Sequence, residues 1–282
     1  MGLYLRPTEL AVALAALAER PFTVLAGGTD VFPAQVGKPL AGDILDIGKI
    51  GDLRGISECG DHFRVGATTT WSDLLAAPLP AWFDGAKSAA REVGGAQIQN
   101  AGTIAGNLCN ASPAADGIPA LMSIDASVEL ARRDDRRVLP LSDFVLGNRR
   151  TARRVDEIVT AILVPKPDHP ARAGFAKLGA RKYLVISIVM VGAMLEVDAG
   201  RVAAARIAVG ACSPVARRLP TLERRLLGAS IARPLSDLVE PEDMRLLAPI
   251  DDARGTATYR LDAARTMVGR LLDALASHGG PP

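Results

Sequence analysis

The sequence predicts an α+β protein whose two parts meet at a proline-rich stretch, residues 165–170. Before that stretch, short strand-like runs alternate with helical patterns and glycine turns. After it, two long runs rich in valine and isoleucine are followed by helical patterns only. Strands followed by a separate group of helices favour the α+β class over a regular βαβ repeat. We therefore expect one domain over 1–167 and a second over 168–282.

Capping residues, glycine and proline mark the ends of four expected helices in the first part. In the first of them, Leu10, Leu14 and Leu17 lie on one face. The helices cover 9–20, with Thr8 as N-cap, 70–77, with a Thr70–Asp73 capping box, 82–93, closed by Gly94-Gly95, and 113–122, opened by Ser112-Pro113.

Runs with β-type composition predict the strands. In the first part they cover 22–25, 44–47, 63–66, a hairpin of 128–132 and 136–139 around Asp134-Asp135, and 158–164. In the second part, strands over 184–197 and 203–209 precede helices over 220–227, 235–239 and 261–276.

Composition excludes several classes of function. The chain has 282 residues, of which 49% are hydrophobic and 23% charged, as in ordinary globular proteins. A net charge of +2 and an aromatic content of 4% disfavour nucleic-acid partners. No apolar stretch is long enough to insert into a membrane. The three cysteines form no Cys-x-x-Cys pair, which disfavours metal or cluster ligation here and favours a cytoplasmic protein.

The most informative motif is Ala26-Gly27-Gly28-Thr29-Asp30, which directly follows a strand-like run. Glycines after a strand let backbone N–H groups converge on an anion, although they are also common in plain turns. A second segment rich in small residues and amides, residues 97–107, has the composition of backbone that lies against a ligand. Two such loops suit the pyrophosphate of a dinucleotide held in a cleft.

Other chemistries are disfavoured by what the motifs lack. The glycine loop is not Gly-x-Gly-x-x-Gly, and no phosphate-binding P-loop sequence is present. His62, His169 and His278 stand in unrelated contexts, so we expect no catalytic triad and no metal site. The sequence therefore predicts cofactor binding without catalytic or metal-ligating residues of its own.

These motifs resemble the FAD-binding subunits of molybdenum hydroxylases, the family of xanthine dehydrogenase and aerobic CO dehydrogenase. The resemblance covers nearly the whole chain, with the motifs in the family's order. It rests on Ala-Gly-Gly-Thr-Asp at 26–30, Thr-Ile-Ala-Gly-Asn at 103–107, Ala-Ser-Pro-Ala-Ala-Asp at 111–116, and the segments 175–181, 186–189, 208–214 and 252–260.

The resemblance implies a two-lobed FAD-binding domain of the vanillyl-alcohol-oxidase (PCMH) type, with lobes of about 1–55 and 56–167. A C-terminal domain like that of CO dehydrogenase flavoproteins, a small antiparallel sheet with helices, then follows. It also implies noncovalent FAD that takes electrons from a small [2Fe–2S] subunit and passes them to NAD, a quinone, oxygen or another acceptor. Substrate oxidation would occur on a large molybdopterin subunit, with the complex a dimer of heterotrimers.

The resemblance further implies which residues contact FAD. Two loops would enclose the pyrophosphate, and three single residues elsewhere would contact the cofactor. Those residues are Val24, Leu25, Ala26, Gly27, Gly28, Thr29, Asp30 and Val31 in the first loop, Thr103, Ile104, Ala105, Gly106 and Asn107 in the second, and Asp116, Val159 and Lys177. Ala105 departs from the glycine usual in the family, and it would be strained only at positive φ.

Two other functions stay open at the level of sequence. The chain could be a self-sufficient noncovalent flavin oxidoreductase of the same fold, or a nucleotide-binding assembly module. The basic run of Arg149, Arg150, Arg153 and Arg154 is interpreted as a solvated loop, with docking of an acidic partner as the alternative.

Overall fold

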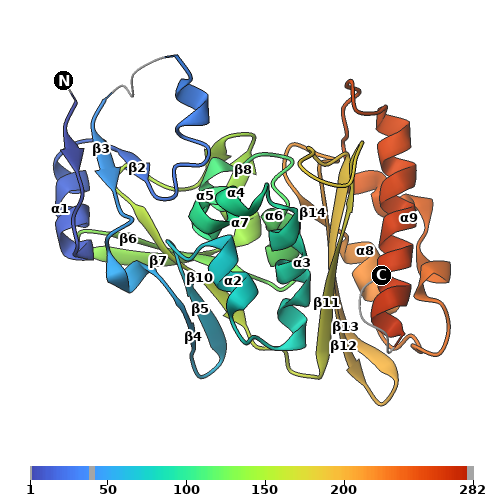
Figure 1. Ribbon diagram of the computed structural model, residues 1–282. Helices are drawn as coiled ribbons and strands as arrows, with labels where there is room; N and C mark the ends of the chain where they lie inside the picture. Colours follow the sequence, from blue (N-terminus) through green and yellow to red (C-terminus); the bar gives the residue numbers. More distant parts are fainter. Residues whose placement is uncertain (1, 38–41, 278–282) are drawn as a thin grey trace.

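The computed structural model describes residues 2–37 and 42–277. Three β-sheets follow one another along the chain, of three, five and four strands, and a small two-stranded hairpin is added to them (Figure 1). A group of helices fills the space between the second and third sheets. This mixture of helices with one parallel and two larger antiparallel sheets confirms the predicted α+β class. No helix in the described ranges combines the length and apolar character needed to cross a membrane.

The first lobe is a parallel sheet of strand order β1-β3-β2, covered by helix α1. Its elements are β1 (Tyr4–Leu5), α1 (Leu10–Glu19), β2 (Thr23–Leu25), β3 (Ile44–Asp46) and the 3-10 turns η1 (Pro33–Gln35) and η2 (Gly51–Leu53). Leu14 and Leu17 of α1 pack on Leu45, as the leucine spacing predicts. The N-cap prediction is wrong, because Glu9, not Thr8, occupies that position and no side chain caps the helix.

The second lobe is an antiparallel sheet of order β4-β5-β10-β6-β7. Its strands are β4 (Ile56–Glu58), β5 (His62–Gly66), β6 (Ser127–Arg132), β7 (Asp135–Pro140) and β10 (Ile158–Pro165). The predicted hairpin is confirmed as β6–β7, with Asp135 already in its second strand. The two lobes share a core, because Ala131 and Ile158 pack into the cluster beneath α1.

Helices of the second lobe cover one side of its sheet (Figure 1). They are α2 (Trp71–Ala76), η3 (Ala81–Phe83), α3 (Asp84–Glu92), α4 (Ala96–Ala101), α5 (Ile104–Asn110), α6 (Gly117–Met122) and α7 (Leu141–Phe144), with the hairpin β8 (Val145–Gly147) and β9 (Arg150–Thr151). The Thr70–Asp73 capping box of α2 is confirmed. Phe63, Trp82 and Phe83 form an aromatic cluster, with ring centroids 4.4 to 5.6 Å apart.

Two predictions for this lobe are wrong. Residues 97–107 are not a loop, because α4 and α5 occupy most of the segment and only Gly102 and Thr103 separate them. The next helix begins at Gly117 and not at Pro113. Ala111 has φ 47°, which ends α5 in a left-handed turn, and the chain needs residues 112–116 to recover a helical direction.

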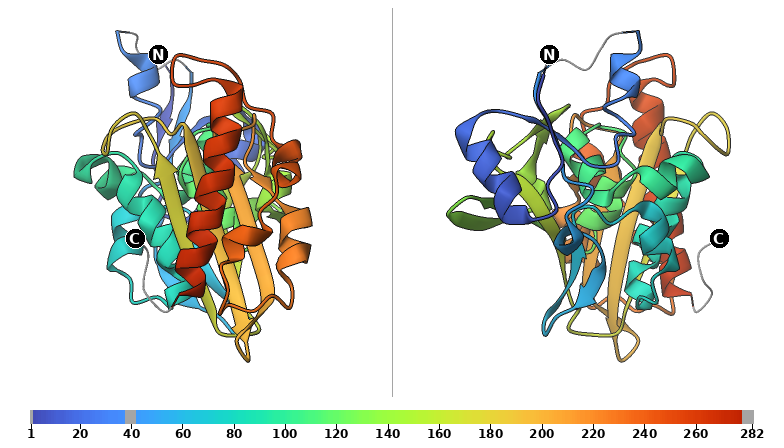
Figure 2. Two further views of the ribbon diagram at one scale, coloured as in Figure 1. Left: turned by 90° about the vertical axis from the view of Figure 1, so that its right-hand side faces the viewer. Right: turned by 60° about the vertical axis from the view of Figure 1, so that its left-hand side comes forward.

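The C-terminal part is an antiparallel sheet of order β11-β12-β13-β14 with helices on its outer face (Figure 2). Its elements are β11 (Ala171–Leu178), β12 (Val189–Asp198), β13 (Arg201–Gly210), β14 (Arg217–Arg218), α8 (Pro220–Leu226), η4 (Leu235–Leu238), η5 (Pro241–Leu246) and α9 (Ala257–Ala276). Strand β12 begins five residues later than predicted, because Leu184 has φ 50° and breaks the extended run. Helix α9 begins four residues earlier than predicted, since Thr256 caps it.

The third sheet lies between two helical layers, α3 and α6 on one side and α9 on the other (Figures 1 and 2). Glycines allow this close approach. A Cβ on Gly192 of β12 would lie 2.4 Å from the carbonyl oxygen of Pro119 in α6. A Cβ on Gly174 of β11 would lie 2.8 Å from Leu271 of α9. The C-terminal sheet is therefore fixed tightly against the helices that also form the candidate site.

Candidate cofactor site

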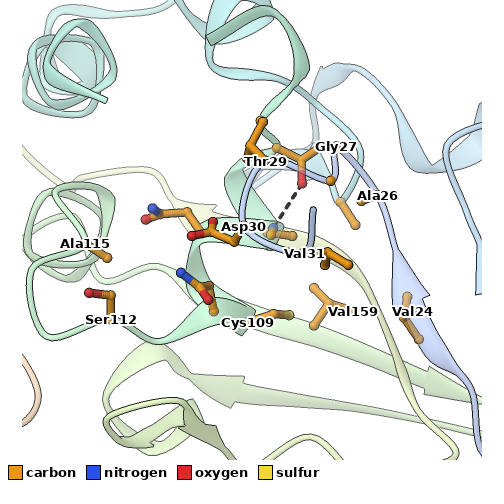
Figure 3. A pocket seen from close by; sticks show the side chains of 18 of the residues that line it. Val24, Ala26, Gly27, Thr29, Asp30, Val31, Cys109, Ser112, Ala115 and Val159 are labelled. Carbon is orange, nitrogen blue, oxygen red and sulfur yellow. Dashed lines mark hydrogen bonds between the residues drawn. The ribbon is translucent and has the colours of Figure 1, made fainter. Parts of the chain in front are cut away.

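A cavity of about 700 Å³ lies where the two lobes meet, a size typical of small-molecule sites. Figure 3 shows its lining: Val24, Ala26 and Gly27 come from the first lobe, whereas Val159 and Cys109 come from the second. The walls are formed by the segment after β2, by α4 and α5, by the start of β10 and by the β8–β9 hairpin. Every lining residue comes from the first 159 residues.

The glycine loop after β2 forms the first wall. A Cβ on Gly27 would lie 1.9 Å from the carbonyl oxygen of Ala101, so the loop backbone lies directly against the end of α4. Gly28 has φ 72°, a conformation that favours glycine. The amides of residues 27–30 donate to no acceptor among residues 2–37 and 42–277. These unpaired donors line a cavity, which is the donor set that a phosphate requires.

The first turn of α5 forms the facing wall. Thr103 caps the helix, and its Oγ1 accepts a hydrogen bond of 3.0 Å from the amide of Gly106. Ala105 is helical and is not among the described residues with positive φ, so alanine causes no backbone strain at this position. The departure from the family's glycine is therefore harmless to the backbone.

Asn107 lines the cavity one turn into α5, and its side chain has an unsatisfied atom. Its Oδ1 is buried and has no hydrogen-bond partner in the described part of the chain. An amide oxygen can only accept, so it requires a hydroxyl or N–H group from a ligand or from water. FAD carries ribityl and ribose hydroxyls as well as a pyrophosphate. The donor set of the loops and this single acceptor both fit such a group.

Asp116 and Lys177 form an ion pair behind the cavity. Lys177 Nζ lies 2.7 Å from Asp116 Oδ2, and Ser187 donates to Asp116 Oδ1 at 2.6 Å. Both ionic side chains are less than a tenth exposed, and neither lines the cavity. Burial raises the pKa of Asp116, although Lys177 and Ser187 act in the opposite direction. The pair joins the start of α6 to β11, and so joins the helical layer to the third sheet.

The structure brings most of the residues that the sequence singled out to one cavity. The residues that line it are Val24, Ala26, Gly27, Gly28, Thr29, Asp30, Val31, Thr103, Ala105, Gly106, Asn107 and Val159. Leu25 and Ile104 are buried in the walls behind it.

Several lining residues were not identified from the sequence. They include Trp71, Cys109, Asn110, Arg149, Thr151 and Arg153. Arg149, Arg150 and Arg154 are exposed, as the solvated-loop interpretation predicts, and Arg153 is half-buried. Arg149 and Arg153 also line the cavity, since the β8–β9 hairpin folds back against the C-terminal end of α5. Burial raises the pKa of the Cys109 thiol to about 11, so it stays protonated at neutral pH. No local pattern marks these positions, because only the tertiary fold brings them to the cavity.

The histidines lie away from the cavity wherever the structure describes them. His62 contacts its neighbour Asp61 at 2.7 Å, and His169 lies between the second and third sheets. His278 lies outside the described residues. Within those residues no group of three or more His, Cys, Asp or Glu side chains is arranged to hold a metal ion.

Comparison with known families gives matches to both parts of the chain. The family model described as the FAD binding domain in molybdopterin dehydrogenase matches residues 1–167. The model of the CO dehydrogenase flavoprotein C-terminal domain matches residues 175–275.

Individual proteins match over similar lengths. A putative xanthine dehydrogenase FAD-binding subunit of Escherichia coli is 29% identical, over 98% of this chain and 97% of its own. The carbon monoxide dehydrogenase medium chain of Afipia carboxidovorans is 30% identical, over 96% and 95%. The solved structure of CO dehydrogenase from Oligotropha carboxidovorans superposes with a TM-score of 0.87 at 26% identity, covering 98% of each chain.

Proposed function

This chain belongs to the FAD-binding subunits of the molybdenum hydroxylase family, and we propose that its inter-lobe cavity binds one FAD noncovalently. Such a subunit is part of an oxidoreductase. The observation that carries the proposed site is the set of unpaired backbone amides at residues 27–30, facing the capped first turn of α5 across one cavity. Bound FAD supplies reversible uptake of electrons; the protein supplies binding, orientation and a fixed electrostatic environment.

In this proposal the two loops hold the pyrophosphate from opposite sides. Residues 24–31 supply backbone donors, with Leu25 anchoring the loop in the core. Residues 103–107 supply the facing wall, with Ile104 buried beneath it. Asn107 Oδ1 accepts from a hydroxyl of the bound dinucleotide, which relieves its missing hydrogen bond.

Three further residues act around the ends of the cofactor. Val159 supplies apolar contact from the start of β10. Asp116 and Lys177 form a buried support at the flavin side, where a cation near the ring favours its reduced, anionic form. Because neither lines the cavity, we propose that they act on FAD mainly through the position of α6 and β11.

We also propose the surroundings in which the subunit works. Electrons arrive from a small [2Fe–2S] subunit, a large molybdopterin subunit oxidises the substrate, and NAD, a quinone, oxygen or another acceptor takes the electrons. The complex is a dimer of such heterotrimers in the cytoplasm, a location favoured by three cysteines that are all free thiols. The domains are 1–167, with lobes of about 1–55 and 56–167, and 168–282; a hydrophobic cluster made only of buried residues between 188 and 276 supports the second domain.

The test is a titration of the flavin-free chain with FAD. We expect one FAD per chain, released into the supernatant on acid precipitation. Gly28→Ala should weaken FAD binding at least tenfold, since the added Cβ lies 2.3 Å from the Phe32 ring beside the loop. Gly200→Ala is the matched control, because φ is 74° there and 72° at Gly28, while Gly200 lies in a distant turn with open space around it.

Two outcomes would count against this proposal. A wild-type chain that takes up no FAD would exclude the cavity as its site. Equal binding by the Gly28 and Gly200 variants would exclude the glycine loop as the pyrophosphate wall.

A further inference from the structure

The segment 112–116, between α5 and α6, forms part of the cavity wall without belonging to a helix or strand. Ser112, Ala114 and Ala115 line the cavity, and Figure 3 shows Ser112 and Ala115 among the lining side chains. Within the segment, Ser112 accepts hydrogen bonds from the amides of Ala114 at 3.3 Å and Ala115 at 3.0 Å. These bonds shape the turn but do not attach it to other elements. Its position therefore depends on contacts with more distant parts of the chain.

Two segments of the C-terminal part supply such contacts. The amide of Ala211, directly after β13, donates to the carbonyl oxygen of Pro113 at 3.0 Å. The hydroxyl of Ser187, shortly before β12, donates to Asp116 Oδ1 at 2.6 Å, and both of these residues are buried. The C-terminal part thus holds the segment 112–116 at two points.

A single buried arginine joins these two segments. Arg260 lies in the first turn of α9 and is 3% exposed. Its Nη1 donates to the carbonyl oxygens of Ile188 at 2.6 Å and Ala211 at 3.1 Å, and its Nη2 donates to Asp252 Oδ1 at 2.7 Å. Each carbonyl acceptor belongs to a residue that contacts the segment 112–116 or adjoins one that does. Helix α9 thereby acts on the cavity wall from the far side of the third sheet (Figure 1).

The backbone of Ala211 shows how firmly this connection is built. Ala211 has φ 61°, a left-handed conformation that is unfavourable for a residue with a Cβ. Such a conformation persists where the surrounding structure fixes it. Pro113 accepts from the N–H of Ala211, and the charged guanidinium of Arg260 donates to its carbonyl oxygen. The arginine therefore helps to hold Ala211 in the orientation that directs its amide at the cavity wall.

We propose that Arg260 is a positioning residue of the FAD site, which holds the segment 112–116 in place through Ile188 and Ala211. The inference rests on the proposed function, since it concerns what fixes one wall of the same cavity. None of the described residues of the C-terminal part lines that cavity. The inference therefore gives this part of the chain an indirect role in cofactor retention.

The experiment compares Arg260→Gln with Arg225→Gln in the flavin-free full chain. Arg225 is the matched control, because it also lies in the C-terminal part and also donates to a carbonyl oxygen, of Leu238 at 2.8 Å, and to a buried carboxylate, of Asp243 at 2.7 Å. FAD dissociation constants are measured by fluorescence titration at a temperature at which circular dichroism shows both variants folded. We expect at least fivefold weaker FAD binding in Arg260→Gln and less than twofold change in Arg225→Gln.

Amide hydrogen exchange of the flavin-free chains shows where Arg260 acts. Peptides that contain Ala114 and Ala115 should exchange at least fivefold faster in Arg260→Gln than in the wild type, because the wall is less firmly held. Peptides from β5 and β10 should exchange at the wild-type rate. Arg260→Lys keeps a charged donor for the carbonyl oxygens and should bind FAD at least twofold more tightly than Arg260→Gln.

Ser187→Ala tests the same connection without changing the arginine. It removes only the hydroxyl that bonds Asp116, so it provides the answer if Arg260→Gln does not fold. We expect at least twofold weaker FAD binding and faster exchange of the peptides that contain Ala114 and Ala115.

Four results would overturn the proposal. They are equal FAD affinity in Arg260→Gln and Arg225→Gln, faster exchange along the whole chain of Arg260→Gln, FAD binding by Arg260→Lys no tighter than by Arg260→Gln, and wild-type affinity and exchange in Ser187→Ala. Failure of the proposed function differs from all of these, since the wild type itself would then bind no FAD.

Discussion

At the scale of single residues, the site separates binding groups from supporting groups. Asn107 lines the cavity and has a buried acceptor that the described protein leaves unsatisfied, so we propose that it belongs to the binding groups. The side chain of Lys177 is 7% exposed and forms an ion pair with Asp116. Its charge is therefore balanced within the protein. The two residues should therefore respond differently to truncation.

We predict that Asn107→Ala weakens FAD binding more than Lys177→Ala does. Asn107→Ala removes the orphaned acceptor, so it should change the free energy of unfolding of the flavin-free chain by less than about 1 kcal/mol. Lys177→Ala leaves Asp116 buried without its partner and should lower that free energy by about 3 kcal/mol. FAD titration and urea unfolding of both variants provide the measurement. Normal FAD affinity in the asparagine variant, together with loss in the lysine variant, would reverse the two roles.

A second residue-scale prediction concerns acid stability. Arg260 is 3% exposed, and its Nη2 donates to Asp252 Oδ1 at 2.7 Å. The amide of Arg254 and the two guanidinium groups lower the pKa of Asp252 from 3.8 to about 2. A carboxyl with a lowered folded-state pKa stabilises the fold above its unfolded pKa and loses this effect as pH falls towards the folded one. Asp252→Asn should therefore reduce stability at pH 7, with the difference shrinking below about pH 4 and vanishing near pH 2.

Urea unfolding of both proteins between pH 7 and pH 2 checks this dependence. If the difference in free energy of unfolding between variant and wild type stays constant across this pH range, the charge of Asp252 does not contribute to stability.

At the scale of elements, the junction of α4 and α5 creates the wall of the site. Gly102 and Thr103 separate the two short helices, and the carbonyl oxygen of Ala101 at the end of α4 lies against Gly27. The Thr103 cap then sets where α5 begins and where its first amides point. A small change in this cap should affect both folding and binding.

We predict that Thr103→Val lowers the free energy of unfolding by about 1 kcal/mol and weakens FAD binding. Thr103→Ser should keep the wild-type stability and FAD affinity, because its hydroxyl still caps the helix. Thr256→Val is the matched control, since Thr256 caps α9 through a bond of 3.2 Å from the amide of Tyr259, far from the cavity. Thr256→Val should lower the free energy of unfolding by a similar amount and leave FAD affinity unchanged. Equal FAD affinity in the Thr103 and Thr256 variants would contradict a role of the α5 cap in binding.

At the scale of the whole molecule, the cavity and the C-terminal sheet are joined by one helical layer. Gly192 of β12 lies directly against Pro119 of α6, so the two parts pack at backbone distance. The described residues contain no cluster of metal-type ligands, and the chain matches FAD-binding subunits of multi-subunit enzymes over almost its full length. The match assigns the chain the role of an FAD-binding electron-transfer subunit.

We predict that the chain purified from its own cells under native conditions is accompanied by a small iron–sulfur protein and a much larger molybdenum protein. Size-exclusion chromatography with iron, molybdenum and flavin assays should give four iron atoms, for two [2Fe–2S] clusters, and one molybdenum per FAD. The complex should have the mass of two heterotrimers. A homogeneous, substrate-active protein with neither metal would contradict the subunit assignment.

The sequence alone determined the elements whose signals are local. The Thr70–Asp73 capping box, the β6–β7 hairpin and the strand β10 follow from capping residues, turn residues and β-type composition within short segments. The order of the glycine and Thr-Ile-Ala-Gly-Asn motifs was likewise sufficient to suggest the family and its cofactor.

Only the tertiary structure decided which residues meet. The parallel pairing of β1 with β3 joins residues 40 positions apart, and the ion pair of Asp116 with Lys177 joins residues 61 positions apart. The cavity positions of Arg149 and Arg153 depend on how the β8–β9 hairpin folds onto α5. Such contacts come from packing between distant segments, and local propensity carries no information about them. Chain-local chemistry therefore indicated the cofactor, whereas long-range packing determined the shape of its site.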